Sequence, residues 1–202
     1  MSAASRERLI GTASRLFHVR SYDSVGVQEL CEEAGVRRGS FYYYFSSKEA
    51  LAIAVLDREE SDILEKIFRP AFENSAPPLE RFEHFLERLH RYHAERTEAE
   101  GGQVGGCPIA NLAHELAGGH PGLRIQAESI LHRFSSFFHI ALEDALSLGH
   151  LDSDVDPDKS AIRIRAYVQG LLELAKMRAD PDVIPELGLD PAGLCVKTST
   201  GR

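Results

Sequence analysis

Apolar residues recur at intervals of three and four along most of the chain, the spacing that places them on one face of an α-helix. Helices are therefore expected over residues 3–19, 27–34, 38–44, 48–72, 79–97, 107–117, 121–148 and 157–179. Outside brief segments of the C-terminal tail, no part of the chain has the alternating pattern of a β-strand. The pattern predicts an all-α protein that consists of a head of three short helices, a long joining helix and a larger helical body.

Two short helices joined by a turn are predicted between residues 27 and 44. Gly35 ends the first of them, because glycine adopts the left-handed backbone conformation that closes a helix. In the second helix, Phe41 and Phe45 are four residues apart and both pack inward. Basic, hydroxyl and phenol groups are left on or near the opposite face, carried by Arg37, Arg38, Ser40, Tyr42, Tyr43 and Tyr44. Such a helix after a glycine turn is typical of a helix-turn-helix that enters the DNA major groove.

Charge is unevenly distributed along the chain. The 202 residues carry a net charge of −8, which argues against a protein that coats nucleic acid. Residues 1–48, however, hold seven Lys or Arg and five Asp or Glu, a net charge of +2, whereas the rest of the chain has a net charge of −10. A head that can approach phosphates is thus attached to an acidic body that repels them. This arrangement fits a DNA reader with a separate regulatory domain.

The chain has no pattern of a membrane segment or of a secreted protein. No apolar run reaches about 18 residues, and the charged N-terminus lacks the apolar core of a signal peptide. The three cysteines form no disulfide pattern. We therefore expect a cytoplasmic protein with reduced thiols, no membrane partner and no cofactor.

A resemblance to the N-terminal domain of TetR-type transcriptional repressors is carried by residues 21–51, S-Y-D-S-V-G-V-Q-E-L-C-E-E-A-G-V-R-R-G-S-F-Y-Y-Y-F-S-S-K-E-A-L. It extends from about Arg8 to Leu56. The resemblance implies a sequence-specific DNA-binding regulator, and a homodimer whose two heads read a pseudo-palindromic operator. It also implies a divergent C-terminal domain that dimerises and binds a small-molecule inducer. We expect three parts: a DNA-binding domain, a helical regulatory and dimerisation domain, and a loosely ordered tail, over residues 1–48, 49–180 and 181–202.

Two positions depart from the pattern of that family. Ser21 stands where the family usually has glycine. Val25-Gly26 stands where the family usually has a Thr/Ser pair that caps the second helix. A phosphate contact that this hydroxyl usually makes is therefore either absent or made by the Gly26 backbone.

The head offers a set of candidate DNA contacts. Lys48 begins a helix, where its ammonium and the helix N-terminus can both address a phosphate. Arg38 and Ser40 are the expected readers of base edges, and Arg37 either reads a base or holds a phosphate. At 100° per residue the three consecutive tyrosines cannot all face inward, so the first two are expected to reach the DNA backbone. The full set is Gln28, Arg37, Arg38, Gly39, Ser40, Tyr42, Tyr43, Tyr44 and Lys48.

The most informative part of the body is residues 105–117, G-G-C-P-I-A-N-L-A-H-E-L-A. Pro108 suits the first position of a helix, which makes Cys107 its cap. Unpaired backbone N–H groups and the helix dipole favour the thiolate there, the form that oxidants and electrophiles attack. The segment resembles a TetR subgroup that includes the N-ethylmaleimide-responsive repressor, which implies a sensing role for Cys107 with Lys176 as its partner. The alternative is that Cys107 is a small apolar residue in a packed body.

Other residues of the body bear on the inducer and on the oligomer. Phe134, Phe137 and Phe138 either line an apolar ligand pocket or belong to the core or the dimer interface. Residues 121–148 and 157–179 have wide apolar faces, from which we expect a four-helix bundle with a second copy of the chain. The candidate inducer or sensor residues are Cys107, Lys176, Phe134, Phe138 and His114, with no metal ligand among them.

Three alternatives to a repressor controlled by an inducer or by Cys107 stay open at this point. Nine histidines suggest a metal-responsive regulator, although a pair such as His90 and His93 is common on solvated helix faces. An enzyme would need Cys107 and His114 to act together, but they lie two turns, roughly 10 Å, apart on one helix. A helical scaffold without DNA binding leaves the helix of tyrosines and arginines unexplained. The pattern fits activation of transcription as well as repression.

Overall fold

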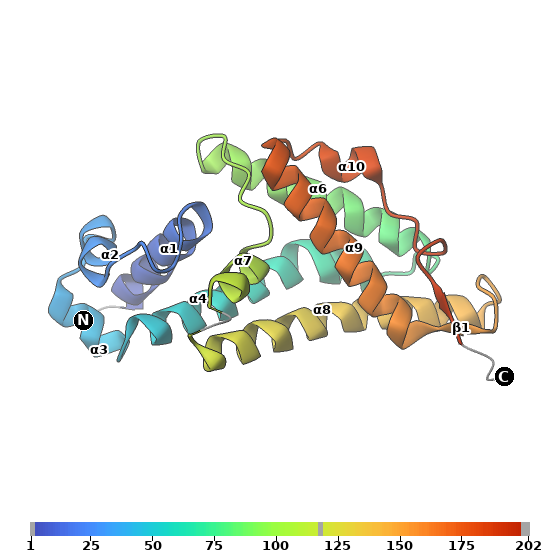
Figure 1. Ribbon diagram of the computed structural model, residues 1–202, viewed down its shortest axis with the longest axis horizontal. Coiled ribbons are helices and arrows are strands. Elements are labelled where there is room, and N and C mark those ends of the chain that lie inside the picture. Colours follow the sequence, from blue (N-terminus) through green and yellow to red (C-terminus); the bar gives the residue numbers. More distant parts are fainter. Residues whose placement is uncertain (1–2, 117–118, 199–202) are drawn as a thin grey trace. The chain divides into compact units, whose positions relative to one another are not determined.

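The computed structural model describes residues 3–116 and 119–198, and Figure 1 shows its helices and strands. The predicted all-α fold is confirmed, because helices account for most of these residues. The elements are α1 (Ala3–Val19), α2 (Val27–Glu33), α3 (Arg38–Tyr44), α4 (Lys48–Ile63), the π-helix η1 (Leu64–Phe68), α5 (Arg69–Phe72), α6 (Glu80–Ala99), α7 (Pro108–Leu116), α8 (Pro121–Ser147), β1 (Val155–Asp156), α9 (Pro157–Arg178), α10 (Val183–Leu187) and β2 (Val196–Lys197). Within the described ranges, no helix has both the length and the apolar character needed to cross a membrane.

The described residues form two compact units. The first takes in residues 3–62 with 107–116 and 119–130, so that α7 and the start of α8 belong with α1, α2, α3 and all of α4 but its last residue. The second takes in residues 63–106 with 131–198. The expected domain limits at residues 48 and 180 do not coincide with the limits of these compact units, and they stay a prediction.

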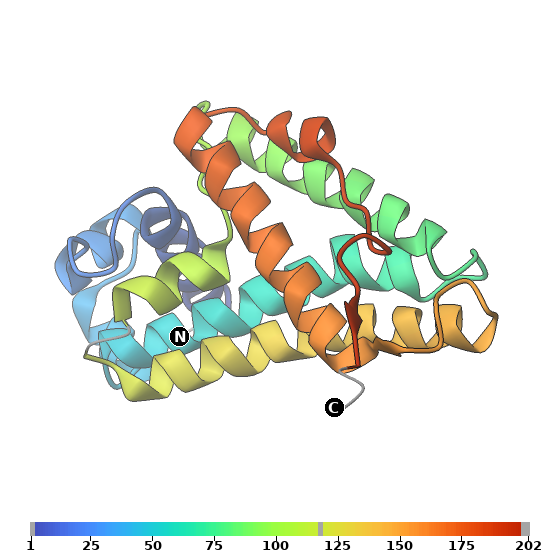
Figure 2. The same cartoon turned by 45° about the vertical axis from the view of Figure 1, so that its right-hand side comes forward.

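In the first unit, α1, α2 and α3 pack against one another around a closed core. Leu9 of α1, Leu30 of α2 and Phe41 of α3 have no exposed surface. Gly35 makes the turn between α2 and α3 with a φ of 60°, which confirms the predicted left-handed residue. α7 also packs on α1, as Figure 2 shows. The head is therefore a three-helix helix-turn-helix to which a helix from later in the chain is attached.

α4 begins behind a cap made by Ser47, whose hydroxyl oxygen accepts the backbone N–H of Ala50 at 3.0 Å. The helical chain continues into α5, but residues 64–68 are π-helical. Pro70 accounts for this change, because it has no N–H to donate to the carbonyl of Lys66 and its ring crowds that carbonyl in a regular α-helix. The wider π-turn accommodates the proline without breaking the helix.

Phenylalanine rings form the core of the second unit. The ring of Phe68, in η1, lies 4.7 Å from that of Phe134 and 5.7 Å from that of Phe138 between centroids. The cluster consists of Phe68, Phe72, Phe82, Phe85, Phe134, Phe137 and Phe138. Phe134 and Phe138 are both buried among these rings, so the structure favours the core interpretation of the two residues over the pocket interpretation.

The part of the tail that the structure describes, residues 181–198, contains α10 and β2 where the pattern predicts loose order. Val183 and Ile184 are fully buried where α10 packs on α6 and α9 (Figures 1 and 2). β2 pairs antiparallel with β1, which places Val155 opposite Lys197. Prolines and glycines break the helical periodicity of this segment without preventing its packing, which is why the pattern does not reveal it.

Candidate nucleic-acid interface and sensor site

The outer face of α3 is aromatic. Phe41 and Phe45 are buried, whereas Tyr42 and Tyr43 are 51% and 66% exposed. Tyr44 is half-buried, with its ring 5.0 Å from that of Tyr43 and nearly perpendicular to it. The two phenylalanines therefore face inward and the phenol groups of Tyr42 and Tyr43 face outward, as the 100° spacing predicts.

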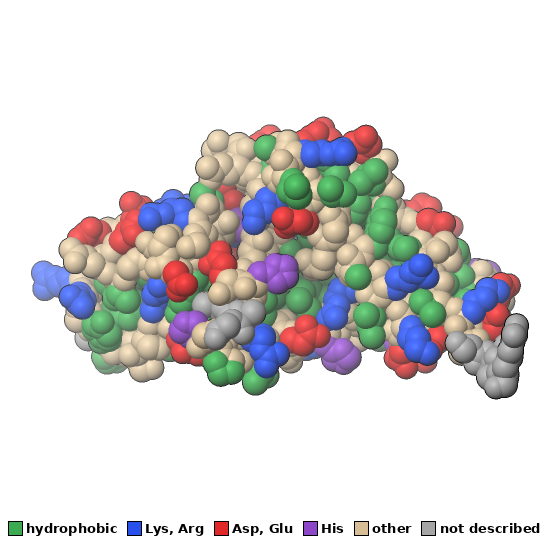
Figure 3. Space-filling model, in the orientation of Figure 1, with side chains coloured by type: hydrophobic (Ala, Val, Ile, Leu, Met, Phe, Trp, Pro, Cys, Tyr) green, Lys and Arg blue, Asp and Glu red, His purple; other side chains and the backbone are tan. Residues whose placement is uncertain are grey.

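The N-terminal end of α3 adds positive charge to this face. Arg37 and Arg38 are exposed, and Figure 3 shows Lys and Arg side chains at the end of the molecule where Figure 1 places α2 and α3. The guanidinium carbon of Arg38 lies 5.9 Å from the ring centroid of Tyr42, a cation–π contact that limits the rotamers of a long side chain. Gly39 is exposed, and a methyl group there would meet nothing within 4 Å. Beside the half-exposed Ser40, a partner can therefore approach the helix backbone closely.

The N-terminal cap of α2 departs from the family pattern in the way that the sequence predicts. Gly26 is the N-cap residue and makes no side-chain hydrogen bond to the helix. Ser21 and Ser24 bond to each other instead: the N–H of Ser24 donates to the Ser21 hydroxyl oxygen at 3.2 Å. Gln28 is exposed, and its amide donates to Glu32 at 2.9 Å. The hydroxyl cap that the family pattern contains is thus absent from this head.

Lys48, at the start of α4, is held by a residue that sequence reasoning missed. Its Nζ atom lies 4.0 Å from the ring centroid of Tyr22. Burial lowers the pKa of Lys48, and the carboxylates of Asp23 and Glu115 oppose this shift. The only signal in the sequence was a single aromatic residue in an otherwise small and polar connector.

Cys107 caps α7 as predicted. Its sulfur accepts the backbone N–H of Ala110 at 3.5 Å, and the side chain is 8% exposed. For Cys31 and Cys195, burial is the largest influence and raises the pKa of both thiols, which keeps them in the less reactive protonated form. His114 is exposed on the same helix.

Lys176 of α9 lies against the residue that precedes Cys107 in the chain. Gly106 has a φ of 71°, and a methyl group there would come within 3.3 Å of the Lys176 Cδ atom. It would also come within 3.5 Å of the backbone carbonyl oxygen of Leu172. Glycine is therefore required at this position both for its left-handed backbone and for the close approach to α9.

The histidines do not assemble a metal site in the part of the chain that the structure describes. No group of three or more His, Cys, Asp or Glu side chains there is arranged to hold an ion. His90 makes a 2.8 Å hydrogen bond with Asp182, and His93 is buried. The metal-responsive alternative has no support among these residues.

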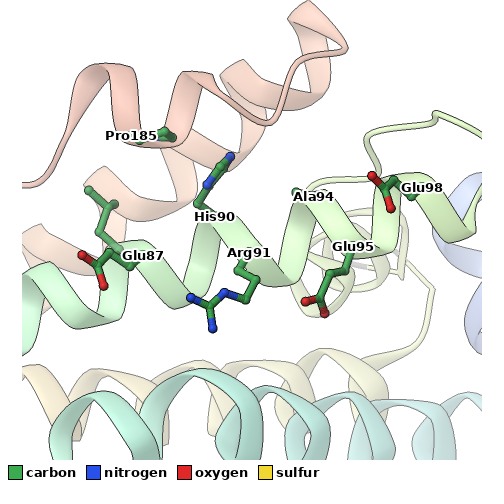
Figure 4. A pocket seen from close by; sticks show the side chains of 8 residues that line it. Glu87, His90, Arg91, Ala94, Glu95, Glu98 and Pro185 are labelled. Atoms are coloured by element: carbon green, nitrogen blue, oxygen red, sulfur yellow. The ribbon is translucent and has the colours of Figure 1, made fainter.

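A groove of about 600 Å³ lies along α6, with one residue of α10 at its edge (Figure 4), and is lined by Leu86, Glu87, His90, Arg91, Ala94, Glu95, Glu98 and Pro185. Half of its lining residues are charged, with both signs present. Small-molecule sites are typically apolar with a few placed polar groups, so this surface groove is a poor inducer site. None of the predicted inducer residues lines it.

Comparison with known proteins matches both parts of the chain to one family. Residues 9–55 match "Bacterial regulatory proteins, tetR family", and residues 78–187 match "Tetracyclin repressor-like, C-terminal domain". The transcriptional regulator AcuR of Cereibacter sphaeroides is 28% identical over 163 residues, 81% of this chain and 72% of AcuR. The HTH-type transcriptional repressor NemR of Escherichia coli is 27% identical over 114 residues, 55% of this chain and 54% of NemR. The crystal structure of a regulatory protein TetR from Rhodobacter sphaeroides has a TM-score of 0.80 at 26% identity, and covers 96% of this chain and 100% of its own.

Proposed function

Because the chain belongs to the TetR family of bacterial transcriptional regulators, we propose that it represses transcription as a homodimer whose two α3 helices read a pseudo-palindromic operator. The observation that carries this proposal is the outer face of α3, where Arg38, Tyr42 and Tyr43 are exposed. Arginine reads guanine edges in the major groove, and tyrosine hydroxyls donate to phosphates. Such a regulator works at the chromosome, and we therefore propose that it is cytoplasmic.

The second copy of the chain is expected on α8 and α9. Regulators of this family generally act as dimers. The large exposed apolar side chains on these two helices in the second unit are Ile140, Ile162, Leu174 and Met177. Met177 is 74% exposed, which is costly for a large apolar side chain in water. A four-helix bundle made of α8 and α9 from each copy would bury these side chains.

Selection of DNA from a randomised duplex library tests this function. The wild-type protein is expected to enrich duplexes with two inverted half-sites whose centres are about 10 base pairs, or a multiple of that, apart. A pool that stays random after selection would refute the reading of DNA. A single, unrepeated motif would refute the symmetric dimer. The enriched duplex is called the operator duplex below.

The release from DNA is proposed to follow either binding of a small-molecule inducer or modification of Cys107. The thiol caps α7 and is 8% exposed, so an electrophile bonded to the sulfur must displace neighbouring groups. The helical stretch that begins at Lys48 then shifts and changes the separation of the two heads. Two heads can read one face of a duplex only when their separation matches one helical turn, about 34–36 Å, or a multiple of it.

Cys107→Ser is expected to keep the affinity for the operator duplex and to lose release by N-ethylmaleimide. In the wild type, the thiolate sulfur bonds to an alkene carbon of the maleimide, the C=C π bond breaks, and the neighbouring carbon takes a proton from water. Serine is a far weaker nucleophile and does not react. Fluorescence anisotropy of the labelled operator duplex, before and after treatment, measures the release.

The matched control for this experiment is Cys195→Ser, which removes a thiol from the tail and is expected to respond to N-ethylmaleimide as the wild type does. If Cys107→Ser is also released as the wild type is, the Cys107 thiol is not the sensor. The inducer alternative then stands alone.

A further inference from the structure

α7 is attached to the head. It packs on α1 and belongs to the same compact unit as residues 3–62 (Figures 1 and 2). Cys107 caps its first turn, and Glu115 lies in its last turn. A helix of nine residues is about 13 Å long and rigid, so a displacement at one end is transmitted to the other.

Glu115 is bonded to the backbone of the head. Its Oε2 atom accepts the N–H of Tyr22, which lies in the connector between α1 and α2. The Tyr22 side chain is buried, and its ring centroid is 5.2 Å from that of Phe17 on α1. A hydrogen bond between a carboxylate and an N–H is charge-assisted and stronger than one between neutral groups. Glu115 therefore fixes the connector to the end of α7.

His120, just before α8, contacts the same part of the head. Its ring meets that of Tyr22 edge-on, with the centroids 5.5 Å apart and the planes at 72°. Its Nδ1 atom lies 3.3 Å from Oε2 of Glu49, in the first turn of α4. His120 therefore joins the connector to the start of α4, next to Lys48.

Tyr22 in turn seats the Lys48 ammonium, whose Nζ atom is 4.0 Å from the ring centroid. Burial, followed by the carboxylates of Glu49 and Asp23, raises the pKa of Tyr22 to about 12. A phenol is neutral near pH 7 even at its ordinary pKa of 10.0, so the face of the Tyr22 ring attracts a cation there. An ammonium has three N–H donors, so one that rests on a ring can still donate to a phosphate on its other side.

We propose that Glu115 and His120 are positioning residues for DNA binding: they hold Tyr22, which seats Lys48 where it meets a phosphate. This inference rests on the proposed DNA-binding function. A lysine already held on the Tyr22 ring loses less conformational entropy when DNA binds, and this smaller loss increases the affinity for DNA. Movement of α7, caused by an inducer or by a modified Cys107, unseats Lys48 and weakens binding. This effect of α7 on Lys48 adds to any shift of α4.

Glu115→Ala is expected to weaken binding to the operator duplex about tenfold, which corresponds to about 1.4 kcal/mol. Glu115→Gln keeps an oxygen that accepts the Tyr22 N–H and is expected to restore most of the affinity. The matched control is Glu87→Ala on α6, which removes the same charge from an exposed site. Loss of a negative charge reduces repulsion of DNA, so charge alone predicts tighter binding by both alanine variants. Tighter or unchanged binding by Glu115→Ala overturns the proposal.

Two further readouts separate positioning from general damage to the fold. A plot of log affinity against log salt concentration has a negative slope, and its magnitude is expected to be smaller by about 1.8 in Glu115→Ala, because each of the two heads loses one phosphate contact. In a double-mutant cycle, Glu115→Ala is expected to add no further loss to Lys48→Ala, because it acts through that lysine. Full additivity of the two losses overturns the proposal.

His120→Ala serves as the second variant if Glu115→Ala does not fold, and the same loss of affinity and salt slope is expected of it. DNA binding by the wild-type protein distinguishes failure of the proposed function from failure of the positioning inference. If the wild type selects no operator, the proposed function fails. If the wild type does select an operator, and Glu115→Ala and His120→Ala both bind it as tightly as the wild type, only this inference fails.

Discussion

Replacing Arg38 by alanine is expected to cost about 2–6 kcal/mol of operator affinity per dimer, the largest effect of a substitution on DNA binding that we predict. Each of the two heads loses a base contact, and a bidentate arginine contributes about 1–3 kcal/mol of discrimination at its base pair. The Tyr42 ring already restricts the guanidinium of Arg38, so little conformational freedom is lost when the base is bound. Affinity for the operator duplex and for a scrambled duplex of the same composition measures the effect.

The control for Arg38→Ala is Arg15→Ala, which removes an equal charge from the head. Arg15 lies on α1 and pairs with Glu33 at 3.0 Å. Its loss is expected to lower both affinities slightly and equally, whereas Arg38→Ala lowers the operator affinity far more than the scrambled one. Equal behaviour of the two variants would remove Arg38 from the base-reading set.

Phe138→Ala is expected to lower the free energy of unfolding by about 3–5 kcal/mol. The side chain is 2% exposed, and four phenylalanine rings lie 5.1–5.8 Å from its own ring between centroids. Alanine leaves a cavity in this cluster, whose rings cannot all move to fill it. Denaturant unfolding at one fixed protein concentration measures the change, because the stability of a dimer depends on concentration.

Phe138→Leu is the matched control, since it keeps most of the apolar volume and is expected to lose less stability than the alanine variant. A side chain that only lined an open ligand pocket would behave differently. In that case the alanine variant would lose about 0.5 kcal/mol or less, as exposed substitutions usually do. Such a result would reinstate Phe138 as an inducer residue.

Much of the head could be predicted because its signals are local. Gly35 and the four-residue spacing of Phe41 and Phe45 each act within one or two turns of helix. The same holds for the cap at Cys107, which depends on the proline that follows it. Helical periodicity and cap chemistry therefore lead from the sequence to these elements without knowledge of the rest of the fold.

Other features depend on contacts that the pattern of a single sequence does not contain. The bond between Tyr22 and Glu115 joins residues 93 positions apart, and neither has a distinctive neighbourhood. α10 is held by burial of Val183 and Ile184, a tertiary effect that outweighs a composition rich in proline and glycine. The helix predicted over residues 48–72 does continue past Pro70, but the periodicity of apolar residues does not reveal that residues 64–68 are π-helical.

Two copies of α3, held at a fixed separation, are proposed to read one face of a duplex. The most direct test compares the affinity of the wild-type protein for the operator duplex with its affinity for the same duplex after insertion of about five base pairs between the half-sites, half a helical turn. We predict that affinity falls to the level of scrambled DNA, because the second half-site then faces away from the second head. Equal affinity for both duplexes would contradict the account.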